Sequence, residues 1–232
     1  MTACLTIAGF DPTGKAGILA DVETFRALGV QPSAVITAST AQNDKRVISI
    51  HPLPPNLITQ QFTALEKPAA IKIGMLGNAA IVRKVAALLK RVRKAPVVLD
   101  PVLRASSGRA LLEPKAIPTL IKHLFPIATV ITPNRAEAEK LLGRKIRDLK
   151  QAALDLLALG PKAVIITGGS KADVLADSSG VLVIKGKRAR GTMRGTGCRH
   201  STALAVYLVK GRTIRQAARQ ARQYVRSCLE SR

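Results

Sequence analysis

The sequence predicts an α/β fold, a doubly wound three-layer α/β/α sandwich around a mainly parallel sheet. Short β-branched runs alternate with amphipathic stretches along the whole 232-residue chain, and the connections between them are short. With 47% hydrophobic residues the chain can also bury a sizeable core. No internal repeat and no linker rich in Pro, Gly or Ser divides the sequence, so we expect a single domain over residues 1–232.

The expected strands are short aliphatic runs of the kind that parallel sheets bury on both faces. In chain order they are Cys4–Ala8, Ala34–Ser39, Ala70–Gly74, Pro96–Asp100, Thr129–Thr132, Ala163–Thr167 and Val181–Lys185. The stretches between them repeat apolar residues at intervals of three and four, which predicts helices with one buried face. These helices are Lys15–Leu28, Asn56–Leu65, Asn78–Arg93, Lys115–Leu124, Arg135–Leu142, Leu149–Leu159, Gly197–Lys210 and Thr213–Glu230. The carboxyl ends of parallel strands meet at one edge of such a sheet, where ligands bind.

The chain is strongly basic, with 37 Lys and Arg against 14 Asp and Glu and a net charge of +23. On the last expected helix, Arg215, Arg219, Arg222 and Arg226 form a stripe, which we interpret as a solvated face. This charge allows association with nucleic acid, but an aromatic content of 3% and the lack of a recognisable binding module disfavour it.

The three cysteines, Cys4, Cys198 and Cys228, are odd in number and far apart, so they form neither a disulfide framework nor a zinc motif. No apolar run approaches the roughly 18 residues that cross a bilayer, and the N-terminus does not resemble a signal peptide. We therefore expect a cytoplasmic protein with no membrane partner.

The loop after the first expected strand, from Gly9 to Gly17, resembles a phosphate-binding P-loop in its glycine spacing. Ala16 nevertheless stands where such a loop needs a hydroxyl for magnesium. Asp11 adds negative charge and Pro12 removes a backbone donor, so both oppose phosphate binding.

A second glycine-rich turn, Gly195-Thr196-Gly197-Cys198, opens an apolar helix. Unpaired N–H groups and the helix dipole favour an anion there, such as a phosphate or a phosphoryl transition state. The same field is expected to lower the pKa of the Cys198 thiol and make a thiolate available as base or nucleophile. The alternative is a turn with a small buried thiol.

Three further signals follow expected strands. Asp100 and Glu137 are candidates for holding Mg²⁺, and Asn134 for contacting phosphate or metal. The turn after Thr167, at Gly168, could admit a nucleotide phosphate. Alternatively, Asn134 and Glu137 form a capping box and Asp100 only ends a strand.

Together these segments resemble the hydroxymethylpyrimidine/phosphomethylpyrimidine kinases of thiamine biosynthesis, within the ribokinase-like superfamily. The resemblance runs in family order from about residue 4 to residue 210. Its text is Thr6-Ile7-Ala8-Gly9-x-Asp11-Pro12-x-Gly14-x-Ala16-Gly17-Ile18-x-Ala20-Asp21, Val35-Ile36-Thr37-Ala38, Ala41-Gln42-Asn43, Lys72-Ile73-Gly74-Met75-Leu76, Val98-Leu99-Asp100-Pro101-Val102, Ile131-Thr132-Pro133-Asn134-x-x-Glu137-Ala138 and Gly195-Thr196-Gly197-Cys198.

The resemblance implies transfer of the ATP γ-phosphoryl group to 4-amino-5-hydroxymethyl-2-methylpyrimidine and then to its monophosphate. It makes Cys198 the catalytic base and the amides of Gly195, Thr196 and Gly197 the anion hole. The substrate residues that it implies are Gly9, Asp11, Ala16, Asp21, Gln42, Met75 and Val102. The resemblance implies that Asn134, Thr167 and Gly168 bind the ATP phosphates and that Asp100 and Glu137 bind Mg²⁺. A homodimer is also implied.

The sequence departs from the family pattern at three positions. Lys15 replaces a usual glycine, Thr167 stands where many members have a lysine, and Arg199 follows the cysteine in place of Thr or Ser. Either Lys15 and Arg199 restore positive charge near the site, or the chain is a drifted, slow enzyme. Two alternatives stay open: a pyridoxal or pyridoxine kinase, and a catalytically impaired pyrimidine-binding regulatory homologue.

Overall fold

The computed structural model describes residues 2–92, 94–167, 172–186 and 193–231. Within these ranges the strands form one nine-stranded sheet in the order β3-β2-β1-β4-β5-β6-β7-β8-β9. The strands are β1 Ala3–Phe10, β2 Gln31–Gln42, β3 Val47–Pro52, β4 Ala70–Ile73, β5 Val97–Leu99, β6 Val130–Ile131, β7 Ala163–Ile166, β8 Ala172–Asp177 and β9 Gly180–Lys185. Six neighbouring strands, β2, β1, β4, β5, β6 and β7, are parallel to one another, whereas β3, β8 and β9 join antiparallel.

All eight expected helices are present, with ends that differ from the expectation by a few residues. They are α1 Gly17–Ala27, α2 Pro55–Thr63, α3 Ala79–Leu89, α4 Ile117–Leu124, α5 Arg135–Leu142, α6 Leu149–Leu157, α7 Thr196–Val209 and α8 Ile214–Glu230. Short 3₁₀ turns extend α3 at Lys90–Val92 and flank α4 at Pro114–Ala116 and Phe125–Ile127.

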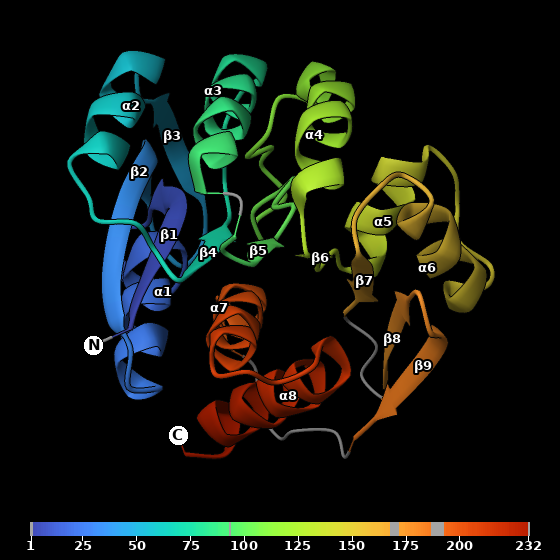
Figure 1. The fold of residues 1–232 in the computed structure, drawn as a ribbon. Coiled ribbons are helices and arrows are strands. Elements are labelled where there is room, and N and C mark those ends of the chain that lie inside the picture. The colour runs from blue at the N-terminus through green and yellow to red at the C-terminus, as the bar shows by residue number, and fades with distance from the viewer. Residues whose placement is uncertain (1, 93, 168–171, 187–192, 232) are drawn as a thin grey trace.

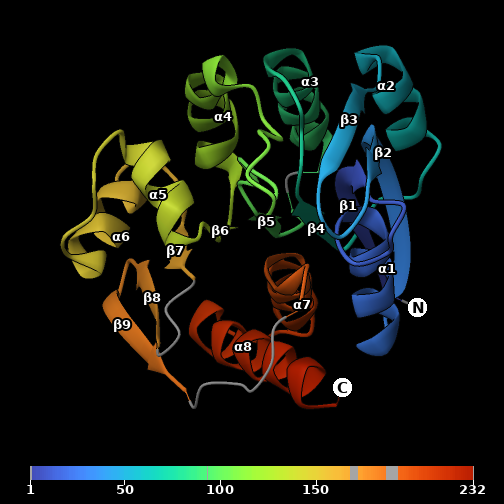
Figure 2. The same cartoon turned by 180° about the vertical axis from the view of Figure 1, so that it is seen from behind.

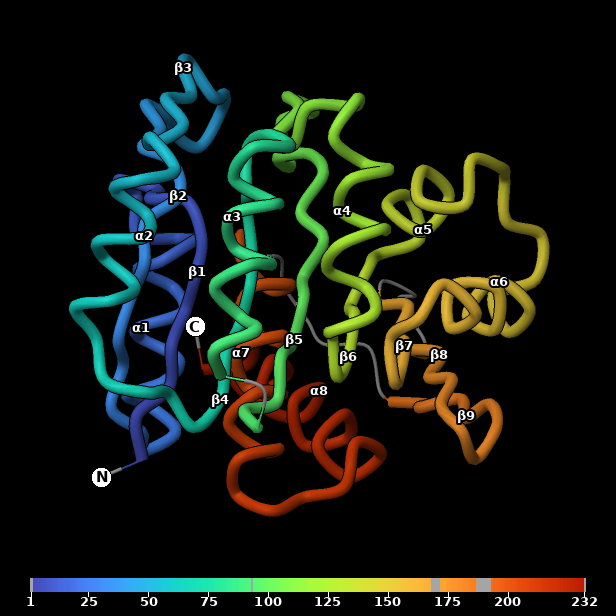
Figure 3. Tube along the Cα trace, turned by 45° about the horizontal axis from the view of Figure 1, so that its top comes forward, coloured from blue at the N-terminus to red at the C-terminus, as the bar shows by residue number. Residues whose placement is uncertain are grey.

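The helices cover both faces of the sheet, as the sequence predicts for a doubly wound sandwich. Figures 1 and 2 show α1, α7 and α8 on one face and α2 to α6 on the other. Helix α7 packs against β4 and β5 in the middle of the sheet (Figure 3). The N-terminus of α7 is thereby brought to the edge at which the central strands end.

Alternation along the strands divides the core in two. In β4, Ile71 and Ile73 belong to the cluster under α2 to α6, whereas Ala70 belongs to the cluster under α1, α7 and α8. Lys72 shares the face of Ala70 because side chains two residues apart in a strand point the same way. A charged side chain is therefore directed into the layer of α1 and α7, where it requires a buried partner.

The stripe of arginines on α8 is only partly the solvated face that we expect. Arg215 pairs with Asp177 of β8 at 2.7 Å, and Arg222 pairs with Asp173 at 2.7 Å. Among the described residues, no helix is both long and apolar enough to cross a membrane.

Candidate active site

A cavity of about 1320 Å³ opens at the edge where the parallel strands end. Nearly all the site residues that the sequence predicts line it: Gly9, Asp11, Ala16, Gln42, Met75, Asp100, Val102, Asn134, Glu137, Thr167, Gly195, Thr196, Gly197 and Cys198. Asp21 does not, since it is fully buried beneath the cavity floor. Gly168 lies outside the described residues. The structure thus gathers residues from across the whole sequence into one site.

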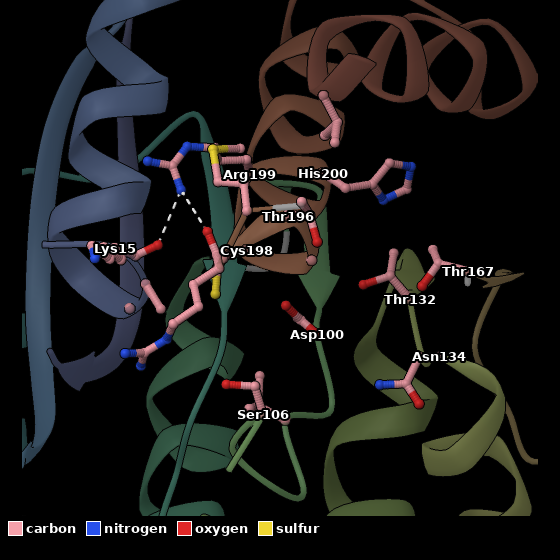
Figure 4. A pocket seen from close by; sticks show the side chains of 18 of the residues that line it. Lys15, Asp100, Ser106, Thr132, Asn134, Thr167, Thr196, Cys198, Arg199 and His200 are labelled. Atoms are coloured by element: carbon pink, nitrogen blue, oxygen red, sulfur yellow. Dashed lines mark hydrogen bonds between the residues drawn. The ribbon is translucent and has the colours of Figure 1, made fainter. Parts of the chain in front are cut away.

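The N-terminus of α7 is held against the first loop of the chain. Gly195, the N-cap residue, has φ 76°, and a side chain there would collide with the carbonyl oxygen of Lys15. The same carbonyl accepts a hydrogen bond of 3.1 Å from Arg199 (Figure 4). Gly195 has no side chain with which to cap the helix, so the first N–H groups of α7 are available to an anion in the cavity.

Cys198 lies in the first turn of α7, and its thiol receives a hydrogen bond from the backbone N–H of Gly17. Burial raises the pKa of this thiol to about 11; the ammonium of Lys72 opposes that shift, and the carboxylates of Asp21 and Asp100 add to it. The expectation of a lowered pKa is therefore wrong for the ligand-free chain. Desolvation and two nearby carboxylates raise the pKa more than the lysine lowers it.

Lys72 and Asp21 form a buried ion pair below the thiol, with the Lys72 Nζ 2.7 Å from the Asp21 Oδ2 and both side chains fully buried. Thr6 donates to the Asp21 Oδ2 at 2.6 Å and Thr202 donates to the Oδ1 at 2.8 Å. Although burial lowers the pKa of Lys72, Asp21, Cys198 and Asp100 raise it overall, so the ammonium stays charged. Asp21 thus orients Lys72, and it makes no direct approach to the cavity.

Lys72 lines the cavity, although it is not among the site residues that the sequence predicts. Its signal is visible in retrospect. It is the one charged residue in the strand Ala70-Ile71-Lys72-Ile73, all of which is buried. A lone charge within such a strand needs a partner, and that partner lies 51 residues away on α1.

Asp100 and Glu137 both line the cavity, and the charge of Asp100 acts on Glu137. Burial raises the pKa of Asp100 to about 6, against the ammonium of Lys72. Burial and the charge of Asp100 raise the pKa of Glu137 to about 8. Within the described ranges, no group of three or more His, Cys, Asp and Glu side chains could hold a metal ion. Two carboxylates still fit Mg²⁺, because this ion keeps several waters and shares substrate phosphates as ligands.

Asn134 and Glu137 also form the capping box that was the alternative interpretation. The Asn134 Oδ1 accepts from the Glu137 N–H at 2.9 Å, and the Glu137 Oε2 accepts from the Asn134 N–H at 2.9 Å. The Asn134 side chain is exposed on the cavity wall beside Thr167 (Figure 4). Its amide nitrogen makes no hydrogen bond to another described residue, so the cap leaves this donor available.

The other end of the cavity combines apolar residues such as Met75 with polar ones such as Gln42 and Arg194. Gly9 and Met75 lie so close together that a Cβ on Gly9 would come within 2.7 Å of the Met75 sulfur. Gln42 stands at the rim, where its amide nitrogen donates to Thr40 at 3.0 Å and its amide oxygen accepts from Arg194 at 3.0 Å. Both functional groups of Gln42 are thus already paired in the ligand-free chain.

The two extra basic residues at this end do not leave free charge beside the phosphates. Lys15 pairs with Asp44 at 2.6 Å, with both side chains largely exposed. Arg199 pairs with Glu23 at 2.7 Å and is turned toward α1. A carboxylate therefore neutralises each of the two charges.

A cavity large enough for a nucleotide, a helix N-terminus open to an anion and two buried carboxyl groups, all at one edge of a doubly wound sheet, suit a small-molecule kinase. The family model described as phosphomethylpyrimidine kinase matches residues 11–232. The chain therefore belongs to the phosphomethylpyrimidine kinase family, and it is an ATP-dependent phosphotransferase.

Individual relatives agree with this family. The chain is 36% identical over 239 residues to a hydroxymethylpyrimidine/phosphomethylpyrimidine kinase of Aquifex aeolicus, covering 98% of this chain and 94% of the relative. A phosphomethylpyrimidine kinase structure from Clostridium difficile has a TM-score of 0.87 and 36% identity, covering 98% of this chain and 99% of that one. A pyridoxal kinase structure from Staphylococcus aureus, in complex with pyridoxal, has a TM-score of 0.90 and 31% identity, covering 99% of this chain and 88% of that one.

Proposed function

We propose that this chain transfers the γ-phosphoryl group of ATP to the hydroxymethyl group of 4-amino-5-hydroxymethyl-2-methylpyrimidine, and then a second one to the resulting monophosphate. The observation that carries the proposal is the meeting of three groups at one point. The Cys198 thiol, the N-terminal amides of α7 and the Asp100 carboxylate converge there, a Cβ on Gly197 lying 3.8 Å from the Asp100 Oδ2. Figure 4 shows Cys198 and Asp100 directed into the same space.

Cys198 acts as the general base. Its thiolate, which the ammonium of Lys72 stabilises, accepts the proton of the hydroxymethyl group while the freed oxygen attacks the γ-phosphorus and ADP leaves. The amides of Gly195 to Cys198 stabilise the charge on the transferring group. Because the thiol is mostly protonated at neutral pH, turnover should rise with pH above 7.

The remaining polar residues position the two substrates. The free amide nitrogen of Asn134 donates to an ATP phosphate, and Thr167 lies beside it as a second donor. Asp100 and Glu137 would hold Mg²⁺, which when bound neutralises phosphate charge. Gln42 pairs with the aminopyrimidine edge, and Gly9, Ala16, Met75 and Val102 surround the ring.

The test is turnover of the purified chain with Mg²⁺, ATP and hydroxymethylpyrimidine, with products resolved by mass spectrometry. Diphosphate is the expected product, and monophosphate alone would restrict the activity to the first transfer. Pyrimidine binding without ATP consumption would favour a regulatory protein and contradict the proposal.

Pyridoxal kinase activity is the second candidate, favoured by the 0.90 TM-score with the pyridoxal kinase in complex with pyridoxal. A panel of pyrimidine and pyridine alcohols under the same conditions separates the two activities by their kcat/KM values. We expect the pyrimidine alcohol to have the higher kcat/KM. The Gln42 amide carries a donor beside an acceptor, which matches the amino group and ring nitrogen of an aminopyrimidine.

We also propose that the protein is a cytoplasmic homodimer. Three free cysteines are consistent with a reducing compartment, and the family resemblance implies the dimer. Light scattering coupled to size-exclusion chromatography measures the mass directly, and a monomer at micromolar concentration would contradict the homodimer.

A further inference from the structure

His200 is a buried titratable side chain to which the mechanism above assigns no role. It lies in α7 two residues after Cys198, and only 6% of its surface is exposed. It lines the cavity. Neither ring nitrogen has a hydrogen-bond partner among the residues that the structure describes. A buried imidazole without partners is unfavourable, so a group that enters the cavity would gain by pairing with it.

The direction of His200 differs from that of its neighbours on the helix. Arg199 turns toward α1, and Ser201 turns toward the sheet, where it donates to Asp100 at 3.2 Å. Figure 4 shows His200 pointing the opposite way from Arg199, toward the side of the cavity where Thr132 and Thr167 lie. It therefore faces the nucleotide end rather than the pyrimidine end.

Two charged groups act on His200, Asp173 of β8 and Arg222 of α8, and they form an ion pair of 2.7 Å. Burial lowers the pKa of the His200 imidazole, Asp173 raises it and Arg222 lowers it, with a net decrease. The ring is thus neutral near pH 7, with one nitrogen that donates and one that accepts. Asp173 offers acceptor oxygens beside it, and its side chain also lines the cavity.

His200 and Asp173 lie between the N-terminus of α7 and the part of the cavity lined by β9 and α8. On one side lie the amides at the N-terminus of α7. On the other side Asp173 is paired in the sheet with Ile184 of β9. There Val183, Val225 and Leu229 offer a wall of apolar side chains to a planar base, among the basic side chains of Lys185, Arg219, Arg222 and Arg226 that also line the cavity. A nucleotide whose phosphates lie at α7 and whose base lies on that wall has its ribose beside His200 and Asp173.

We propose that His200, together with the Asp173 carboxylate, binds the two ribose hydroxyls of the nucleotide. The inference rests on the proposed function, since it takes ATP as the occupant. A vicinal diol supplies two donors and two acceptors, which match a carboxylate and a neutral imidazole.

The experiment measures affinities for ADP and for 2′,3′-dideoxy-ADP by calorimetry. We expect the unaltered chain to bind ADP roughly tenfold more tightly than the dideoxy compound, the effect of about one lost hydrogen-bond pair. In His200→Leu, ADP affinity should fall roughly tenfold and the preference should disappear. His200→Gln, which keeps a donor and an acceptor, should retain part of it.

The controls separate a ligand contact from a structural role. His123→Leu, on α4 across the sheet, should leave both affinities unchanged. In the absence of nucleotide His200→Leu should have a Tm no lower than that of the unaltered chain, because no described hydrogen bond is lost.

Each other outcome overturns the inference. A preference for ADP that persists in His200→Leu excludes the contact, and an equal loss for both nucleotides excludes the ribose as its target. Failure of the unaltered chain to bind ADP would overturn the proposed function as well, whereas the first two results would leave that function standing. If His200→Leu does not fold, His200→Gln decides, since unchanged affinities for both nucleotides would refute the contact.

Discussion

Two pairs of buried ionisable groups lie in and beneath one cavity, and they differ in how their charge is balanced. Asp21 and Lys72 are opposite in sign, 2.7 Å apart, and the carboxylate also accepts from two threonines. Asp100 and Glu137 are alike in sign, and each has its pKa raised by burial. The first pair is complete within the folded chain, whereas the second keeps a proton near neutral pH and, as we propose, would exchange it for a cation. We therefore propose that the first pair supports the site and that the second binds Mg²⁺.

Cys198 is influenced by both pairs, and replacing it is the largest effect that we predict. Cys198→Ala should lower kcat by roughly 10²- to 10⁴-fold, the usual contribution of a general base, with little change in Tm. Steady-state kinetics and thermal unfolding measure the two effects. Cys228→Ala, on α8 away from the cavity lining, is the matched control, and normal turnover in Cys198→Ala would refute the assigned base.

The charge of Lys72 should also be visible in the pH dependence of turnover. The unaltered chain should become faster from pH 7 upward as the thiol, with its pKa raised to about 11, loses its proton. Without the lysine, the same rise should shift to higher pH. A pH–rate profile that is flat above neutrality would contradict a thiolate base.

Among these variants, breaking the Asp21–Lys72 ion pair should have the largest effect on stability. Lys72→Met leaves the Asp21 carboxylate buried without a cation, which should destabilise the fold by about 3–5 kcal/mol and lower Tm by roughly 10 °C. Thermal and denaturant unfolding measure it. The double variant Lys72→Met/Asp21→Asn removes both charges and should recover much of the loss. A double variant as unstable as the single one would show that packing, rather than charge, is what Lys72 supplies.

The unbalanced pair should respond to pH in the absence of Mg²⁺. Because the folded state raises the pKa of Glu137 to about 8 and that of Asp100 to about 6, it binds more protons than the unfolded chain between about pH 4 and pH 8. Stability should therefore fall as pH rises through that interval. Glu137→Gln, which keeps a capping-box side chain, should raise Tm at pH 8 by roughly 2–4 °C.

Added Mg²⁺ should favour the unaltered chain instead. At pH 8 it should raise the Tm of the unaltered chain more than the Tm of Glu137→Gln. Differential scanning calorimetry with and without the ion measures both effects. A Tm that neither falls with pH nor rises with Mg²⁺ would exclude the carboxylate pair as the cation site.

The sequence predicts the parts of this molecule that depend on local pattern and misses those that depend on pairing at a distance. Every expected strand and helix is found, because apolar periodicity reports burial directly. Strands β3 and β8 are missed, since short antiparallel strands of mixed polarity carry no continuous apolar run. The glycine turn at Cys198 is correctly predicted to open a helix. The thiol pKa is predicted in the wrong direction, because desolvation and the carboxylates of Asp21 and Asp100 are properties of the packed fold.

At the pyrimidine end of the cavity, the polar groups of Gln42 already have partners within the chain, as Asp21 and Lys72 do. Replacing Gln42 should therefore have only a small effect on substrate binding. Its amide already pairs with Thr40 and Arg194, which leaves one N–H and one lone pair for the substrate and limits the gain from binding to two neutral hydrogen bonds. Gln42→Ala should therefore raise KM for the pyrimidine only about three- to tenfold and leave kcat nearly unchanged. Gln60→Ala, exposed on α2, is the control. A much larger loss would mean that Arg194 releases Gln42 without cost, and a loss confined to kcat would place Gln42 at the reacting group instead of the ring.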